Sequence, residues 1–183
     1  MKTKLISIEV PEGKKVEWVN NVLTLVDDKP KDIMERIKTF KDALNELGRN
    51  HPLVFQYNNI DDVDSDLTAY LKLRIIVAAL NEGWTPKFTE DECRYYPYFY
   101  LYTKDEVERM DEDKKKNLVA FGGFAFSGTS CDLGYVYSYN AFSSSYALYG
   151  SRLALKTREL AEYCGKQFKE LWFDFCVGNE FRR

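Results

Sequence analysis

The sequence predicts an α+β fold in a single domain spanning residues 1–183. The expected order is an N-terminal β-hairpin, two helices, an antiparallel three-strand meander and a C-terminal helix. Apolar residues recur at helical spacing over residues 33–47, then alternate with period two in parts of residues 84–140. The chain has 45% hydrophobic and 30% charged residues and a net charge of −3, a globular balance. This composition excludes low-complexity, collagen-like and broadly basic proteins.

Residues 1–26 are predicted to form the hairpin. Its first apolar run is residues 5–10, its turn is Pro-Glu-Gly-Lys at residues 11–14, and its return run is residues 16–26. The hairpin can pack as part of the same sheet system as the later strands.

Two helices are expected next. The first spans residues 33–47, where the apolar residues lie on one face of a helix, with Asp32 as its N-cap and Gly48 at its C-terminal end. Four aspartates then precede a helix at residues 67–81 that is apolar almost all round, which is typical of a helix buried by its neighbours.

The remaining elements follow from alternation and then a return to helical spacing. Strands are predicted at residues 94–102, 118–126 and 133–139, and short connections favour antiparallel pairing. The acidic stretch at residues 105–113 is expected to be a solvated helical turn or loop. A helix is predicted over residues 151–173, with Thr157 able to cap or start part of it.

The cysteines and the N-terminus indicate a cytoplasmic protein. The widely spaced Cys93, Cys131, Cys164 and Cys176 fit neither a disulfide framework nor zinc knuckles, so reduced thiols are expected. There is no apolar run of roughly 18 residues, so we expect no membrane partner. The N-terminus lacks signal-peptide features and is interpreted as mature sequence.

No catalytic residue, metal site or cofactor is predicted. His51 is the only histidine and is expected at a helix C-terminus or on the surface. The aspartates at residues 62–66 resemble the start of a calcium loop, but Leu67 and Leu73 replace its glycine and glutamate. Glycines at residues 123–128 have P-loop spacing, but Thr129 replaces the lysine.

A run of tyrosines is the strongest candidate for a binding surface. One strand face would carry four of them and a second strand would carry three more: Tyr96, Tyr98, Tyr100 and Tyr102, then Tyr135, Tyr137 and Tyr139. If Phe99 packs on the helices, the tyrosine face is partly open and can anchor a protein or stack on bases. Alternatively, a second layer such as the hairpin covers it. Pro97 indicates a sheet edge or a bulge.

Basic residues of the C-terminal region offer a second, smaller signal. Arg152 and Lys156, with Lys166, could contact phosphate, although acidic residues on the same helix leave only a small surplus. Most such helices are simply solvated.

Three short motifs, in order, resemble an uncharacterised family of small proteins found in gut bacteria and their phages or mobile elements. They are Ile-Glu-Val-Pro-Glu-Gly at residues 8–13, the block from Leu71 to Pro86 followed by Arg-Tyr-Tyr at residues 94–96, and Leu-Lys-Thr-Arg-Glu-Leu-Ala at residues 155–161. Leu155 and Thr157 depart from the family's Phe and Ser. The resemblance implies origin and layout and adds no catalytic residue.

The leading hypothesis is therefore a non-enzymatic binding module that acts through a protein partner or self-association at the tyrosine face. The alternative is a nucleic-acid accessory protein that combines tyrosine stacking with the basic residues. A weaker third hypothesis is a small enzyme whose acidic residues converge on a cleft.

Overall fold

The computed structural model describes residues 7–60, 64–87, 89, 91–115, 118–119, 131–141 and 151–177. Contacts divide the chain into two compact units, Met1–Arg36 and Ile37–Arg183. We call the first the hairpin unit and the second the body. Both helices and strands are present, in agreement with the predicted α+β class.

The hairpin unit contains strands β1 (Lys14–Val19) and β2 (Val22–Asp27), paired antiparallel. The turn is Asn20–Asn21, with φ of 50° and 63°, and not residues 11–14 as predicted. Two successive positive φ values are typical of the type I′ turn, which asparagine tolerates and which matches the twist of the flanking strands. Of the predicted first strand, residues 5–10, the first two lie outside the described residues and residues 7–10 form no strand.

By strand pairing, the hairpin is a two-stranded sheet of its own among the described strands. The unit ends with α1 (Ile33–Arg36), where the Arg36 guanidinium donates to the carbonyls of Pro30 and Lys31 at 3.1 and 2.9 Å.

The body begins with α2 (Phe40–Leu47), so the single helix predicted over residues 33–47 is wrong. Thr39 and Asp42 form a capping box: the Asp42 N–H donates to Thr39 Oγ1 at 3.2 Å, and the Thr39 N–H donates to Asp42 Oδ2 at 2.8 Å. This box starts a new helix and breaks the periodic stripe. Gly48 ends the helix as predicted, at φ 78°, and its N–H donates to the Leu44 carbonyl.

A short helix that the sequence analysis missed, α3 (Pro52–Asn58), follows. His51 is its N-cap, and His51 Nδ1 accepts from the Leu53 N–H at 3.3 Å. Pro52 occupies the first turn, where its missing N–H costs nothing. The only histidine therefore begins a helix, and the expectation that it lies at a helix C-terminus or on the surface without a role is wrong.

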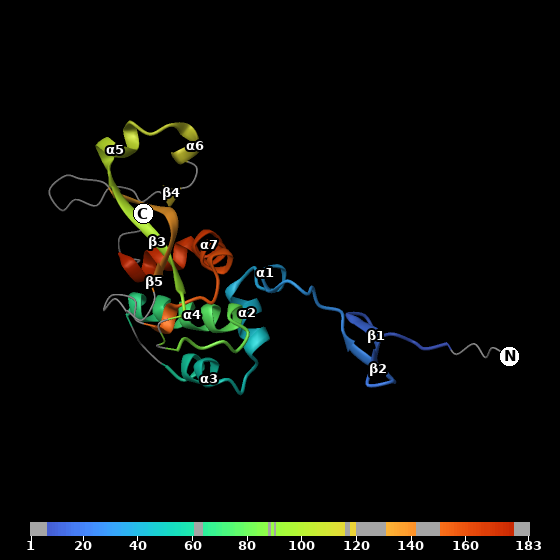
Figure 1. The fold of residues 1–183 in the computed structure, drawn as a ribbon. Coiled ribbons are helices and arrows are strands. Elements are labelled where there is room, and N and C mark those ends of the chain that lie inside the picture. Colours follow the sequence, from blue (N-terminus) through green and yellow to red (C-terminus); the bar gives the residue numbers. More distant parts are fainter. Residues whose placement is uncertain are drawn as a thin grey trace. The chain divides into compact units, whose positions relative to one another are not determined.

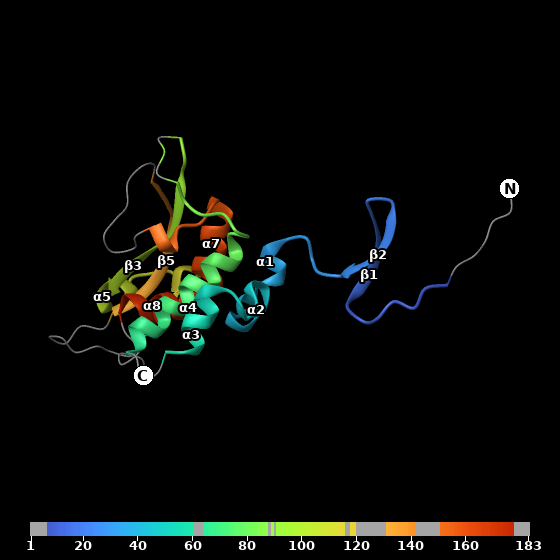
Figure 2. The same ribbon diagram turned by 90° about the horizontal axis from the view of Figure 1, so that it is seen from below.

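The longest helix, α4 (Ser65–Leu80), confirms the predicted apolar helix. Its buried side chains come from all round its axis, and it packs against α2, α3 and α8 (Figures 1 and 2). Asp64 stands at the N-cap without a side-chain capping bond, so capping does not explain this aspartate. Asp61 and Asp62 lie outside the described residues.

The body's sheet contains β3 (Arg94–Thr103), β4 (Leu118–Val119) and β5 (Cys131–Ala141), all antiparallel. The order is β3-β5-β4, so the predicted meander is wrong. Two short helices, α5 (Lys104–Glu108) and α6 (Glu112–Lys115), separate β3 from β4 in the chain. β3 and β4 do not pair, and β5 lies between them. Residues 120–130, with the P-loop-like glycines, lie outside the described residues.

The predicted C-terminal helix is three elements: η1 (Ser151–Leu153), α7 (Arg158–Gln167) and α8 (Lys169–Cys176). Thr157 caps α7, as its Oγ1 accepts from the Leu160 N–H at 3.3 Å, in agreement with the role expected of it. Phe168, at φ −114°, separates α7 from α8. Figure 1 shows α7 alongside β3 and β5, which it contacts.

The core of the body lies between the sheet and these helices. Its largest fully buried apolar side chains are Trp172, Phe173, Leu153, Leu155, Ile37, Leu73, Ile75, Ile76 and Leu80. Three of the cysteines, Cys93, Cys164 and Cys176, are free thiols. None of the described helices combines the length and apolar content needed to cross a bilayer.

Candidate functional site

The tyrosines of β3 pass from buried to open along the strand. Tyr96 is 4% exposed, Tyr98 and Tyr102 are half-buried, and Tyr100 is 46% exposed. The rings of Tyr100 and Tyr102 lie 4.8 Å apart between centroids. The tyrosine face, defined as Tyr96, Tyr98, Tyr100 and Tyr102, is therefore closed at its first residue and open at Tyr100.

The closed end contains a charged residue that the sequence analysis did not single out. Arg94 is fully buried two positions before Tyr96. Burial raises the pKa of Tyr96, and the positive charge of Arg94 acts in the opposite direction. Arginine is mostly exposed in folded proteins, so the sequence holds no signal that this end of the strand is covered.

The other face of β3 packs on the helices. The rings of Phe99 and Trp172 lie 5.7 Å apart, so Phe99 contacts α8 as the sequence analysis required for an open tyrosine face. Tyr95 forms an isolated bridge with Leu155, with N–H to carbonyl distances of 3.1 and 2.9 Å. Beyond that bridge, no described strand pairs with the outer edge of β3, and Pro97 lies on this edge strand.

The tyrosines of β5 do not all pair with tyrosines of β3. Tyr139 pairs with Tyr96 and Tyr137 with Tyr98, but Tyr135 pairs with Phe99 because the register shifts by one residue. The backbone register therefore places Tyr135, unlike Tyr137 and Tyr139, opposite a residue that is not a tyrosine. An irregularity in one strand changes which residues lie opposite each other, and sequence alternation alone does not reveal it.

The two predicted basic residues have different surroundings. Arg152 is exposed in η1, whereas Lys156 Nζ lies 2.9 Å from Glu82 Oε2 in an ion pair. The backbone N–H of Lys156 donates to Asn81 Oδ1 at 3.0 Å. Lys156 is therefore part of the local structure, and its charge already has a partner.

Asn81 is a structural residue that the sequence analysis did not identify. It is buried directly after α4, and its Nδ2 also donates to the Ala154 carbonyl at 2.8 Å. With the Lys156 bond, Asn81 fixes the extended segment that leads from η1 into α7. Two motifs of the family resemblance, the block ending at Pro86 and the stretch at residues 155–161, thus meet at Asn81.

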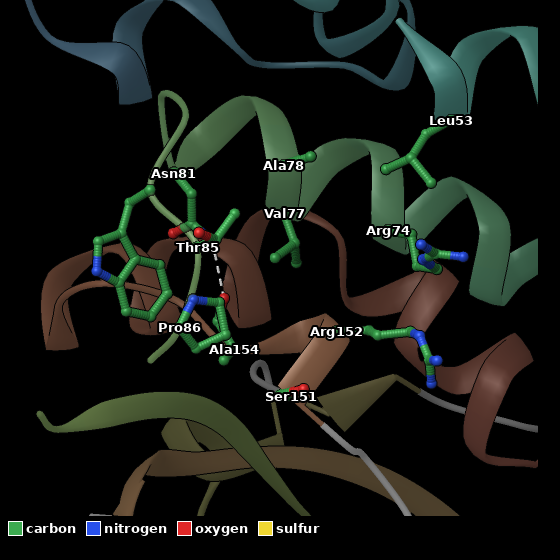
Figure 3. A pocket seen from close by; sticks show the side chains of 11 residues that line it. Leu53, Arg74, Val77, Ala78, Asn81, Thr85, Pro86, Ser151, Arg152 and Ala154 are labelled. Carbon is green, nitrogen blue, oxygen red and sulfur yellow. Dashed lines mark hydrogen bonds between the residues drawn. The ribbon is translucent and has the colours of Figure 1, made fainter. Parts of the chain in front are cut away.

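A pocket of about 310 Å³ lies beside Asn81, between the C-terminal half of α4, the connector after it, and η1 (Figure 3). Its described lining is mostly apolar and includes two arginines but no carboxylate. The lining residues are Leu53, Arg74, Val77, Ala78, Asn81, Trp84, Thr85, Pro86, Ser151, Arg152 and Ala154.

The acidic residues of the stretch 105–113 do not line this pocket and form no metal site among the described residues. Asp105, Glu106, Glu108, Asp111, Glu112 and Asp113 are all exposed on α5, α6 and their connection. No group of three or more histidine, cysteine or acidic side chains in the described part of the chain is arranged to hold a metal ion.

The hairpin unit presents an apolar face of its own. Cross-strand partners share a face, and the register groups Val16 with Leu25 and Trp18 with Leu23. Trp18 is 71% exposed, and Leu23 and Leu25 are also exposed. Lys14 and Asp27 form an ion pair at the end of this hairpin face, defined as Val16, Trp18, Leu23 and Leu25.

Comparisons with known proteins return no matches. No protein-family model, no curated protein and no solved structure matches the chain. The resemblance to the gut-bacterial and phage family stays a prediction.

Proposed function

We propose that the chain is a binding module that acts through a protein partner or a second copy of itself, using the tyrosine face of β3. The observation that carries the proposal is the open end of that face, where Tyr100 is 46% exposed beside Tyr102 on an edge strand. The phage or mobile-element origin implied by the family resemblance belongs to the same proposal.

Tyrosine suits such a surface for two reasons. Its ring offers apolar area with few rotatable bonds, and its hydroxyl can find a partner across an interface. Because Phe99 contacts Trp172 on the opposite face, the backbone that holds the tyrosines is anchored to the body. A surface that is already ordered loses less entropy on binding.

The exposed hairpin face supports the same function independently. Exposed apolar patches on small proteins commonly mark association sites, and an isolated two-stranded hairpin is only marginally stable in water. Trp18 supplies the kind of large aromatic side chain that often dominates binding energy.

The nucleic-acid alternative has less support. Stacking at Tyr100 and Tyr102 would suit it, and Arg152 is exposed, but the Lys156 charge is already paired with Glu82. The small-enzyme alternative gains no support from the pocket, because no carboxylate is found among its described lining residues.

The test is a tagged pull-down from bacterial extract, with and without nuclease, using the wild type, Tyr98→Ala/Tyr100→Ala and the control Phe55→Ala. Phe55 is an aromatic residue of the body that is 65% exposed away from β3. Sedimentation of the purified proteins measures self-association in parallel. We expect a nuclease-resistant partner, or a self-associated species, that the double variant loses and the control keeps.

Two results would contradict the proposal. The first is a correctly folded double variant that keeps the same partner and the same sedimentation behaviour. The second is material that is retained only without nuclease and falls steeply with salt, which would favour the nucleic-acid alternative.

A further inference from the structure

The pocket beside Asn81 brings together two arginines from distant parts of the sequence. Arg74 lies on α4 and Arg152 on η1, and both line the cavity. Figure 3 shows their guanidinium groups at the same end of the pocket, away from Asn81 and Thr85. Among the described residues, neither arginine has a hydrogen bond or ion pair to a carboxylate.

Two cations at one cavity whose described lining holds no acidic residue produce a positive potential that favours an anion. A guanidinium group is planar and can donate two parallel hydrogen bonds to the oxygens of one carboxylate or phosphate group. The Arg74 group also lies 5.9 Å from the Tyr70 ring centroid, a cation–π contact that limits where the side chain can turn.

The rest of the lining is suited to the apolar part of a ligand. Val77, Ala78 and Ala154 form part of the wall, and Trp84 and Pro86 come from the connector after α4. The volume of about 310 Å³ is near the lower end of the range for small-molecule sites, roughly 300–1,000 Å³. Thr85 and Ser151 add hydroxyl groups to the lining.

The wall of this pocket is held in place by the Asn81 bonds. Asn81 Nδ2 donates to the Ala154 carbonyl, drawn as a dashed line in Figure 3, and Asn81 Oδ1 accepts from the Lys156 N–H. These bonds connect the end of α4 to the segment that follows Arg152. The two elements that supply the arginines are thus tied to each other.

We propose that this pocket binds a small molecule in which a phosphate or carboxylate group is attached to an apolar or aromatic group. Arg74 and Arg152 bind the phosphate or carboxylate. The pocket shares no residue with the tyrosine face, so this site is independent of the proposed function.

The chain contains three tryptophans, which provide an internal readout. Trp84 lines the pocket, Trp172 is buried in the core and Trp18 lies in the hairpin unit. Titration with phenyl phosphate, followed by two-dimensional ¹H–¹⁵N NMR, is expected to shift the Trp84 indole N–H signal and leave the other two unchanged. Trp84→Phe assigns that signal.

The affinity is expected to fall by about tenfold or more in Arg74→Gln and in Arg152→Gln, because each loses a charge-assisted bond. Arg49→Gln is the matched control, since Arg49 is exposed outside the pocket and its replacement removes the same charge. Phenylacetate should also bind, and its affinity relative to phenyl phosphate identifies the preferred anion. Inorganic phosphate should bind more weakly, and benzyl alcohol should not bind.

Several results would overturn the inference. Phenyl phosphate could leave the Trp84 signal unmoved, or bind equally well to both arginine variants while their spectra show a folded chain. An equal loss in Arg49→Gln would show a general charge effect. Benzyl alcohol binding as tightly as phenyl phosphate would exclude anion recognition, and inorganic phosphate binding as tightly would exclude a role for the apolar wall.

Discussion

The hairpin unit and the body both carry large apolar side chains but bury them to different extents. Trp18 in the hairpin unit is 71% exposed, whereas Trp172 in the body is 1% exposed. The body surrounds its apolar helix α4 with other elements, but the hairpin's apolar residues lie on a two-stranded sheet without a second layer in its own unit. The comparison indicates that the body has a packed core of its own, whereas the hairpin unit buries little of its apolar surface within itself.

Replacing a tryptophan with alanine in each unit should give the largest difference in the free energy of unfolding. Trp172→Ala is expected to lower the free energy of unfolding by about 3–5 kcal/mol, because it leaves a large cavity in a packed core. Trp18→Ala should change it by no more than about 0.5 kcal/mol, as expected for an exposed residue. Urea unfolding followed by circular dichroism measures both.

If Trp18→Ala lowered the free energy of unfolding by about 2 kcal/mol or more, the contrast between the two units would be wrong. It would show that the hairpin face is buried in the folded chain.

A second prediction concerns the bonds that hold the body's last segment. Asn81→Ala should cost about 2–3 kcal/mol, because the Ala154 carbonyl and the Lys156 N–H both lose their side-chain partner. Asn59→Ala is the matched control: Asn59 is exposed and donates one bond to Phe55, so its loss should cost about 0.5 kcal/mol or less. Equal stability losses would contradict the role assigned to Asn81.

A third prediction uses the buried thiol of Cys164. Burial raises the pKa of Cys164 from 9.0 to about 12, and the neighbouring Trp172 indole opposes this shift. Above pH 9 the unfolded thiol loses its proton while the folded one keeps it, so stability falls as the pH rises. The stability lost between pH 8 and pH 10 should be about 1.4 kcal/mol greater in the wild type than in Cys164→Ala.

Equal pH dependence of stability in the two proteins would show that Cys164 does not titrate with an elevated pKa in the folded body.

The smallest expected effect is in the hairpin turn. Asn21 has a φ of 63°, which glycine adopts without steric cost. Asn21→Gly should therefore stabilise the hairpin by about 0.5 kcal/mol, seen as slower amide exchange in β1 and β2 and unchanged exchange in α4. Faster exchange in the strands would contradict the turn assignment.

Local chemistry made part of the fold predictable. Apolar content indicated α4, alternation indicated β3, and Gly48 and Thr157 marked helix ends as observed. Two errors had readable local signals: the Asn20–Asn21 pair marks the turn, and Thr39 with Asp42 marks a new helix start. Attention to apolar periodicity alone overlooked both.

The other differences from the predicted arrangement depend on contacts between distant residues. The β3-β5-β4 order and the register shift at Tyr135 are set by pairing across the sheet. The tyrosine face was recognisable from alternation, but its burial at Tyr96 was not. The pocket was not predictable because Arg74 and Arg152 meet only through the fold.

The most direct test of the proposed binding role is site-specific photo-crosslinking. A benzophenone amino acid is placed at position 100 in the tyrosine face or at position 55, an exposed aromatic site on α3. After irradiation in bacterial cells and nuclease treatment, the proposal predicts a discrete protein adduct, to a partner or a second copy, from position 100 and not from position 55. No adduct from position 100, or the same adducts from both positions, would contradict it.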